Sequence, residues 1–207
     1  MKNIKALASG ILAVVFIAVS GFTTLDKNST VKAPTWEIDP VHSNISFEVR
    51  HFFTPVNGQF KDYSAQINFS PDNLEESSVN LEIAVSSIST DNEKRDGHLQ
   101  SDDFFNAEKY PKITFKSDKI TKEGENMYVA QGKLTIKDVT KDVKLPFTLL
   151  GVQDHPQKEG TKIAGVGMDY SLNRNEFNVG TGSWSETAVV GDEVNISIGL
   201  EMQHTAK

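Results

Sequence analysis

One short charged segment of the sequence gathers residue types that could move protons. Asp91, Glu93, Arg95, Asp96 and His98 fall within eight residues. A histidine beside a carboxylate suits general acid–base catalysis, so His98 with Asp96 is one candidate for proton transfer. The alternative is a solvated, capped helical segment whose carboxylates neutralise Arg95, and the composition of the segment favours this second interpretation.

Other catalytic and metal-binding patterns do not occur in the sequence. The five histidines include no pair two to four residues apart, so a zinc site has little support. Cysteine is absent, which excludes disulfides, thiolate metal sites and cysteine nucleophiles. Neither a Gly-x-Ser-x-Gly elbow nor a glycine-rich phosphate loop is present. We therefore expect no catalytic residues, no metal and no cofactor.

The composition is that of an acidic protein of ordinary globular type. The chain has 207 residues and a formal net charge of −7, and charged residues make up 24% of it. A pI near 5.2 argues against nucleic-acid binding, because phosphate neutralisation needs clustered basic groups. A chain of this length can bury one sizeable core without disulfides.

The N-terminal segment has the order of a secretory signal peptide. Lys2 and Lys5 precede a nearly continuous apolar run over residues 6–19, and small residues follow it. The run is shorter than the ~20 residues that a helix needs to cross a bilayer, and an uncleaved anchor is the alternative. We expect a signal peptide over residues 1–22, a flexible lead-in over residues 23–34, and a periplasmic or secreted protein without a stable membrane span after cleavage.

Alternation of apolar and polar residues with period two dominates the rest of the chain. Ile45, Phe47, Val49 and His51 share one face of a predicted strand. Seven further segments alternate in the same way, around residues 65–69, 79–85, 113–115, 128–136, 143–149, 164–172 and 194–200, with a short ninth candidate at 36–39. Such strands bury one face, and closure removes exposed edges. We therefore expect an all-β, eight-stranded antiparallel barrel; a two-sheet sandwich is the alternative.

Residues 91–110 interrupt the strands with charges and helix formers. We expect two short helical segments there, near one mouth of the barrel, the second beginning near Phe104. Two pairs of adjacent phenylalanines, Phe52–Phe53 and Phe104–Phe105, break the alternation, because neighbours in a strand point to opposite faces. Each pair is expected either to plug an end of the barrel or to form an apolar gate over a cavity.

The interior of such a barrel has room for one small ligand, unless side chains fill it. Burial of each methylene group of a ligand contributes about 0.8 kcal/mol, so ten of them contribute about 8 kcal/mol before entropic costs. An apolar tail alone can therefore provide useful affinity. An apolar cavity with a few polar groups is what a lipid site requires.

Four motifs, in order along the chain, resemble the YceI family. They are the run from Trp36 to His51, the stretch from Asp91 to Pro111, the hairpin from Gly132 to Lys141, and the closing section with Arg174, Phe177 and Gly191–Val194. The resemblance covers about residues 35–202, which is essentially the whole predicted mature chain.

The resemblance implies an extended, lipocalin-like barrel over residues 35–203 that binds a long-chain amphiphile. Members of the family are associated with polyisoprenoids, including isoprenoid quinones or their precursors, and with fatty amides. They are typically exported bacterial proteins and are often dimeric. We therefore expect a non-enzymatic carrier or sequestering protein whose partner is an isoprenoid lipid or quinone, with a homodimer as one option. The alternatives are an enzyme acting on an isoprenoid or quinone precursor, and a closed structural barrel.

Strand facing and family position together give the candidate ligand-binding residues. The tail is expected to lie against inward-facing apolar side chains: Ile45, Phe47, Val49, Ile83, Phe115, Leu134 and Phe147, with Phe104 and Phe105 near the mouth. The polar contacts near the mouth are predicted to be His51, Arg95, His98 and Arg174. A slip of one residue would reverse the facing of any strand.

Overall fold

The computed structural model describes residues 32–206; the predicted signal peptide and most of the predicted lead-in lie outside them. Strands make up most of the described chain: β1 Thr35–Ile38, β2 Asn44–His51, β3 Thr54–Phe60, β4 Tyr63–Asn68, β5 Ser78–Ala84, β6 Ile88–Ser89, β7 Lys112–Lys122, β8 Met127–Ile136, β9 Val139–Asp154, β10 Thr161–Asn173 and β11 Val190–Thr205. The helical elements are α1 Glu93–Gln100 and the 3₁₀ turns η1 Val85–Ser87, η2 Arg174–Phe177 and η3 Gly182–Ser185.

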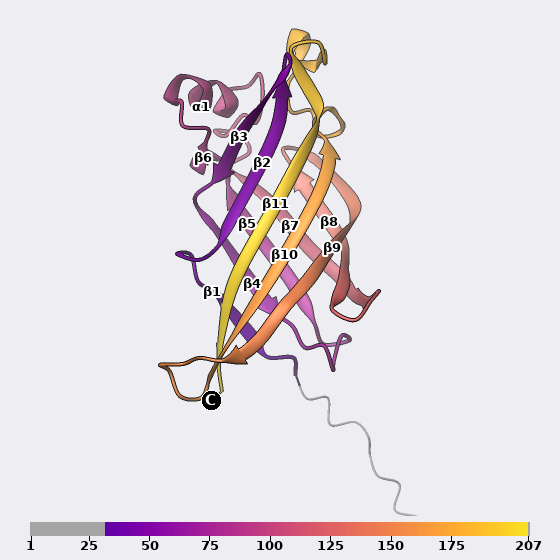
Figure 1. Cartoon of the computed structure of the whole chain (residues 1–207). Helices are drawn as coiled ribbons and strands as arrows, with labels where there is room; N and C mark the ends of the chain where they lie inside the picture. The colour runs from indigo at the N-terminus through magenta and orange to yellow at the C-terminus, as the bar shows by residue number, and fades with distance from the viewer. Residues whose placement is uncertain (1–31, 207) are drawn as a thin grey trace, which may run out of the picture. The chain divides into compact units, whose positions relative to one another are not determined.

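The strands form one antiparallel sheet that closes on itself (Figure 1). The ring runs β1-β4-β5-β7-β8-β9-β10-β11, and β11 returns to β1 where Gln203 lies opposite Glu37. The other part of β11 pairs with β2, between Val190 opposite His51 and Gly199 opposite Asn44. The predicted eight-stranded antiparallel barrel is therefore confirmed, and the two-sheet sandwich is wrong because the ladder continues around the ring.

Three neighbouring strands of the barrel are each broken into two. Residues 39–43 separate β1 from β2, residues 61–62 separate β3 from β4, and η1 separates β5 from β6. The pairs β1–β4 and β4–β5 continue beyond the breaks as β2–β3 and β3–β6. The alternation did not predict β3, because Pro55 and Gly58 disfavour a strand. At two residues, β6 is too short to show a period.

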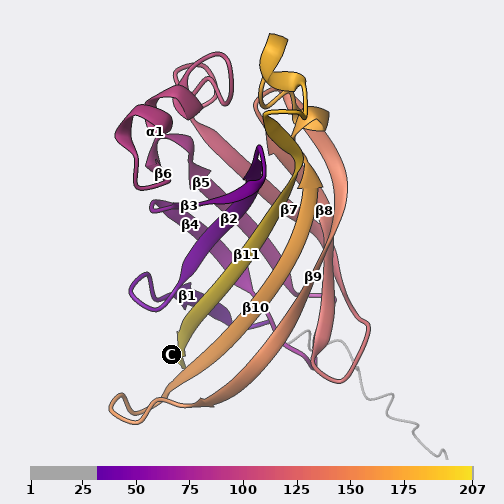
Figure 2. The same ribbon diagram turned by 45° about the horizontal axis from the view of Figure 1, so that its top comes forward.

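Helix α1 lies beside β6 at one end of the barrel (Figures 1 and 2). Among residues 32–206, β6 pairs with β3 and has no ladder partner on its other side, where α1 and the turns after it stand. Asn92 caps α1 by accepting a hydrogen bond from the Arg95 amide at 3.0 Å. The second predicted helical segment is wrong, since the chain around Phe104 makes turns instead. Within the described residues, no helix combines the length and hydropathy needed to cross a bilayer.

Aromatic side chains fill the barrel at the end opposite to α1. The ring centroids of Phe69, Tyr128 and Phe147 lie 5.1 to 5.6 Å apart, in edge-to-face and stacked pairs. Trp36 donates its indole N–H to the Phe69 carbonyl at 2.9 Å, which satisfies this buried polar group. Packed rings therefore close this end, which leaves the α1 end for access to the interior.

Candidate functional site

The inside of the barrel contains three apolar pockets that follow one another along its length. Their volumes are about 110, 90 and 100 Å³, in order from the α1 end. The first two share Phe47 and Ile113 in their walls, and the last two share Phe115 and Ile198. Because neighbouring pockets share walls, we treat them as one lumen with an upper, a middle and a lower part. The barrel interior is therefore not packed shut.

All nine apolar residues predicted to contact a ligand tail lie in the walls of this lumen. Seven of them come from strands, and Phe104 and Phe105 come from the turns after α1. The upper part is lined by Phe47, Val49, Phe104 and Phe105, the middle part by Ile45, Ile83, Phe115 and Leu134, and the lower part by Phe147. Their contact with a ligand stays a prediction.

The Phe47 side chain keeps its place in the wall because the residue opposite it is a glycine. Phe47 on β2 faces Gly58 on β3. A Cβ atom at Gly58 would lie only 2.3 Å from Cζ of the Phe47 ring. The ring thus lies over the glycine, an arrangement that covers the exposed backbone of a strand glycine.

Part of the lumen wall was missed by the sequence analysis. Phe60, Ile88 and Leu99 line the upper part and come from β3, β6 and α1. Two of these elements were not recognised as strands, and Leu99 is the single apolar residue with a long side chain in α1. A signal did exist for Phe60, because Val56, Gly58 and Phe60 fall on alternate positions.

A fourth pocket of about 380 Å³ lies between α1, the β2–β3 hairpin and η3. We call it the side pocket. It shares several walls with the upper lumen, including Val49, Leu99 and Phe104. Its remaining walls combine apolar and polar side chains, from Val56, Trp184, His51, Thr90, Asn92, Lys94, Arg95 and His98. The side pocket therefore places several polar side chains next to the apolar lumen.

Arg95 is predicted as a polar ligand contact, but its guanidinium is already engaged. Its Nε donates to the Thr90 hydroxyl at 2.7 Å, and its Nη2 donates to the Thr90 carbonyl at 2.8 Å. Asp96 accepts from the Thr90 amide at 2.8 Å. These bonds fix α1 to the chain just after β6, so both side chains have a structural role.

His98 is paired with a different carboxylate from that of the acid–base alternative. Its Nε2 lies 2.9 Å from Oδ2 of Asp103, whereas Asp96 accepts from Thr90, so the His98–Asp96 pair of that alternative does not form. The His98 ring makes edge contacts with Phe104 and Trp184, at centroid distances of 5.1 and 4.9 Å. His98 thus forms part of the wall between the side pocket and the upper lumen.

Arg174, the fourth predicted polar contact, is a buried cation held by backbone carbonyls. It is 3% exposed and lines the upper lumen. Its guanidinium donates to the carbonyls of Gly191, Val179 and Val190 at 2.7 to 2.8 Å. Burial lowers the pKa of Arg174 from its ordinary value, since desolvation disfavours the charged form. Arg174 therefore holds η2 and the loop after it against β11, and a contact with a ligand head group stays a prediction.

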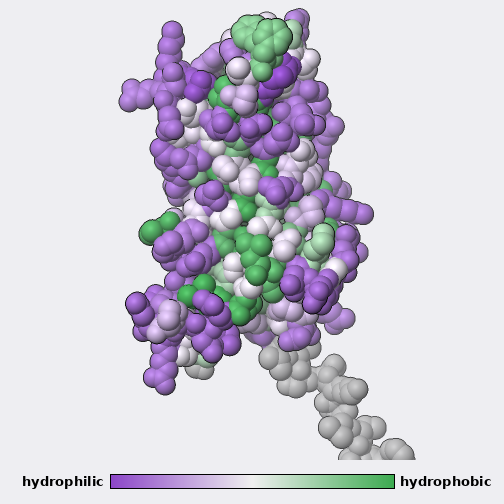
Figure 3. Space-filling model, in the orientation of Figure 1, coloured by the Kyte–Doolittle hydropathy of each residue, from purple (hydrophilic) through white to green (hydrophobic). Residues whose placement is uncertain are grey.

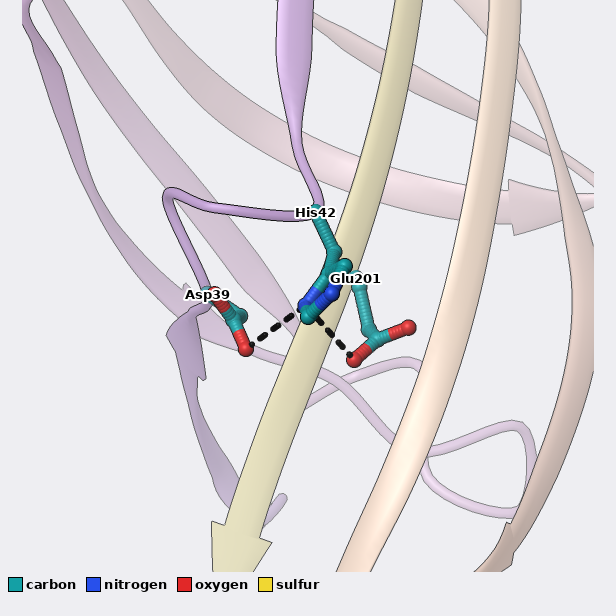
Figure 4. Close-up of side chains that lie close together, drawn as sticks. All are labelled: Asp39, His42 and Glu201. Carbon is teal, nitrogen blue, oxygen red and sulfur yellow. Dashed lines mark hydrogen bonds and ion pairs between the residues drawn. The ribbon is translucent and has the colours of Figure 1, made fainter.

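A polar cluster lies where β1 breaks off before β2 (Figure 4). His42 Nδ1 is 3.2 Å from Oδ2 of Asp39 and 3.6 Å from Oε1 of Glu201 on β11. Among residues 32–206, these three side chains form the single group whose ligand atoms, all within 4.8 Å of one another, could share a metal ion. Sequence spacing did not reveal it, because Glu201 is far along the chain. The cluster also ties the break between β1 and β2 to β11.

This cluster predicts a pH-dependent contribution to stability. The hydrogen bond from His42 to Asp39 raises the pKa of His42 above 6.5 and lowers the pKa of Asp39 below 3.8. The pair therefore contributes its full stabilisation between pH 3.8 and pH 6.5, the ordinary pKa values of the two groups. This stabilisation is lost as pH rises through the folded-state pKa of His42, and also as pH falls through the folded-state pKa of Asp39.

We expect His42→Ala to lower the free energy of unfolding more at about pH 5.5 than at about pH 8.5. The effect is small because His42 is exposed to solvent and Asp39 is only partly buried. Urea unfolding of the two proteins at both pH values measures it, and equal differences at the two pH values would contradict the role of this pair.

Comparison with known proteins connects this barrel with one family. The YceI-like domain matches residues 36–202. Protein YceI of Escherichia coli is 33% identical over 161 residues, which cover 77% of this chain and 81% of that protein. The crystal structure of Burkholderia cenocepacia BcnA is similar with a TM-score of 0.71 and 32% identity, over 80% of this chain and 99% of that chain.

A more distant structure has the same fold. It is a polyisoprenoid binding domain from Saccharophagus degradans, with a TM-score of 0.60 and 12% identity over 83% of this chain and 99% of that chain. The domain match and the identity to Escherichia coli YceI agree with the four motifs in the sequence. The chain therefore belongs to the YceI family.

Proposed function

We propose that this protein holds a long-chain isoprenoid-type lipid in its barrel and serves as a carrier or sequestering protein in the periplasm or outside the cell. The observation that carries the proposal is the apolar lumen, which is closed by aromatic rings at one end and shares walls with the side pocket and its polar side chains at the other. Such a shape suits an amphiphile with an apolar tail and a polar head.

The dimensions and chemistry of the lumen support a flexible apolar tail. Three adjacent pockets of about 110, 90 and 100 Å³ approach, together, the lower end of the volumes typical of ligand sites. Every methylene group buried there contributes about 0.8 kcal/mol. A similar fold in the Saccharophagus degradans domain, which is described as polyisoprenoid binding, adds support for this class of ligand.

The proposal also gives the lipid an orientation. The tail points toward Phe147 and the aromatic cluster, and the head group lies in the side pocket. Arg95 and Arg174 are occupied by oxygen atoms of the protein, so His51 and Lys94 are the side chains that we assign to the head group. The side pocket combines polar side chains with apolar side chains that it shares with the upper lumen, which suits the junction between head and tail.

Mass spectrometry of bound lipid tests the proposal directly. The mature protein is purified gently from its native host and extracted with organic solvent, and the extract is analysed. We expect one isoprenoid-type lipid or quinone per barrel. A protein that yields no lipid, and that takes up no added polyprenyl alcohol after delipidation, would overturn the proposal.

A further inference from the structure

The turn between β2 and β3 presents two aromatic side chains to solvent at the α1 end of the barrel. Phe53 is 96% exposed and Phe52 is 48% exposed. His51 and Thr54 form the last pair of the ladder, so the two phenylalanines make up the whole turn. They neither plug the barrel nor cover the lumen, so both roles predicted for this pair are wrong. We call Phe52 and Phe53 the aromatic tip.

The backbone of the aromatic tip is unusual for its residue types. Phe52 has a φ of 49°, in the left-handed region that bulky side chains rarely occupy. Two-residue hairpin turns normally carry Asn-Gly or a similar pair for this reason. Phe53 has almost no contact that would offset this conformational cost inside the described structure. Contacts within the described structure therefore do not explain a phenylalanine at position 53.

The turn is anchored and lies beside the side pocket. Arg50 donates to the carbonyls of Phe52 and Thr187, and the Phe52 amide donates to the Val189 carbonyl at 2.7 Å. The rings of Phe52 and His51 are in edge contact at 4.7 Å, and His51 lines the side pocket. Figure 1 shows the β2–β3 turn at the same end of the barrel as α1. The aromatic tip thus stands beside the side pocket.

The extent of the aromatic tip indicates what kind of surface it meets. Two phenylalanine side chains bury about 150–250 Å² each, well below the ~800 Å² per partner of a stable protein interface. In Figure 3, hydrophilic residues flank this face, and the hydrophobic residues gather mainly along its middle and in its lower half, away from the α1 end. The segments 49–54 and 182–190 together contain one arginine and one glutamate, so the turn and the loop that anchors it carry no net formal charge.

We propose that the aromatic tip inserts into the surface of a lipid bilayer and holds the side pocket against the membrane during exchange of the lipid. A bilayer accepts a small apolar insertion without a large complementary surface, and aromatic side chains on a polar support suit the membrane interface. The insertion is driven by apolar contact and not by attraction to charged lipids. The role in lipid exchange rests on the proposed carrier function, whereas the insertion of the tip into a bilayer does not depend on that function.

Flotation of the mature protein with phosphatidylcholine vesicles tests the insertion. We expect Phe53→Ser to lower the vesicle partition coefficient about 10- to 30-fold, because the variant lacks the apolar side chain whose transfer from water into the bilayer favours binding. Val41→Ser is the matched control, since Val41 is 81% exposed but lies in the break between β1 and β2. We expect Val41→Ser to stay within about twofold of the wild type, and added salt to change neither value.

A spectroscopic variant reports on the environment of the tip itself. Phe53→Trp should shift its tryptophan emission to shorter wavelength when vesicles are added, after subtraction of the wild-type signal. An unshifted emission, equal partitioning of Phe53→Ser and wild type, or binding only to anionic vesicles would overturn the proposal. Self-association that Phe53→Ser abolishes, in place of vesicle binding, would assign the tip to a second copy and overturn it as well.

Lipid content separates this proposal from the proposed function. Vesicle insertion by a protein that carries no lipid would support membrane insertion of the aromatic tip and overturn the proposed carrier function. Bound lipid in a protein that does not partition into vesicles would support the carrier function and overturn membrane insertion of the tip. Phe53→Ser that is loaded by detergent exchange should retain the wild-type amount of lipid, because Phe53 lines none of the lumen pockets described above.

Discussion

Replacement of Ile198 by tryptophan is expected to lower the lipid occupancy of the barrel at least about tenfold while the barrel remains folded. Ile198 lines both the middle and the lower lumen, so an indole there fills space that the tail needs. Overpacking of this kind typically costs about 1–3 kcal/mol, less than the stability of most domains. Lipid per protein after organic extraction measures occupancy, and circular dichroism with a thermal melt measures folding.

The neighbouring residue supplies a matched control for this substitution. Ser197 precedes Ile198 on β11 and is exposed on the outer face, where it lies opposite Ser46. Ser197→Trp adds the same indole outside the barrel, so it should leave the lipid content unchanged. Full occupancy in Ile198→Trp would show that the tail does not lie in this part of the lumen.

Arg174→Met is expected to be the most destabilising of the substitutions considered, with a loss of about 3–5 kcal/mol in the free energy of unfolding. The variant keeps most of the apolar length but removes the donors from the carbonyls of Gly191, Val179 and Val190. A buried acceptor without a donor costs about 1–3 kcal/mol. The urea midpoint should fall by about 1 M or more.

Arg95→Met is the control for Arg174→Met. Arg95 also donates to a backbone carbonyl, that of Thr90, but it is exposed, so water replaces the lost bonds. We expect a loss of about 1 kcal/mol or less for Arg95→Met. If Arg174→Met left stability unchanged and instead reduced lipid binding, Arg174 would be a head-group contact and not a structural anchor.

Period-two patterns predicted the parts of the fold in which one face of a long strand is buried. The strand with Ile45, Phe47 and Val49 is an example, and its apolar face does line the lumen. The pattern failed where local chemistry and tertiary context disagree. Pro55 and Gly58 made β3 unrecognisable as a strand from the sequence. Phe52 and Phe53 occupy a tight turn for which glycine and asparagine are the usual residues.

The candidate site was predictable to a lesser degree, because its polar part depends on which residues meet in space. The pairing of His98 with Asp103 follows from the turns after α1, and these turns were expected to be helical. The approach of Glu201 to His42 follows from the register of β11 beside β1 and β2. The binding of Arg174 to three carbonyls depends on the path of a loop. None of these arrangements has a periodic signal in the sequence.

The missing ladder on one side of β6 affects how fast the barrel can exchange its contents. Separation of two neighbouring strands elsewhere in the barrel would break a row of backbone hydrogen bonds. Beside β6 the wall instead consists of α1 and its side chains, of which Leu99 lines the upper lumen. Displacement of α1 breaks no strand ladder, only side-chain contacts and the bonds from α1 to Thr90, Ser86 and Asp103, so we expect local opening there to be more frequent than global unfolding. Under the proposed function, we therefore expect a long lipid tail to enter sideways past α1 and not end-on along the barrel axis.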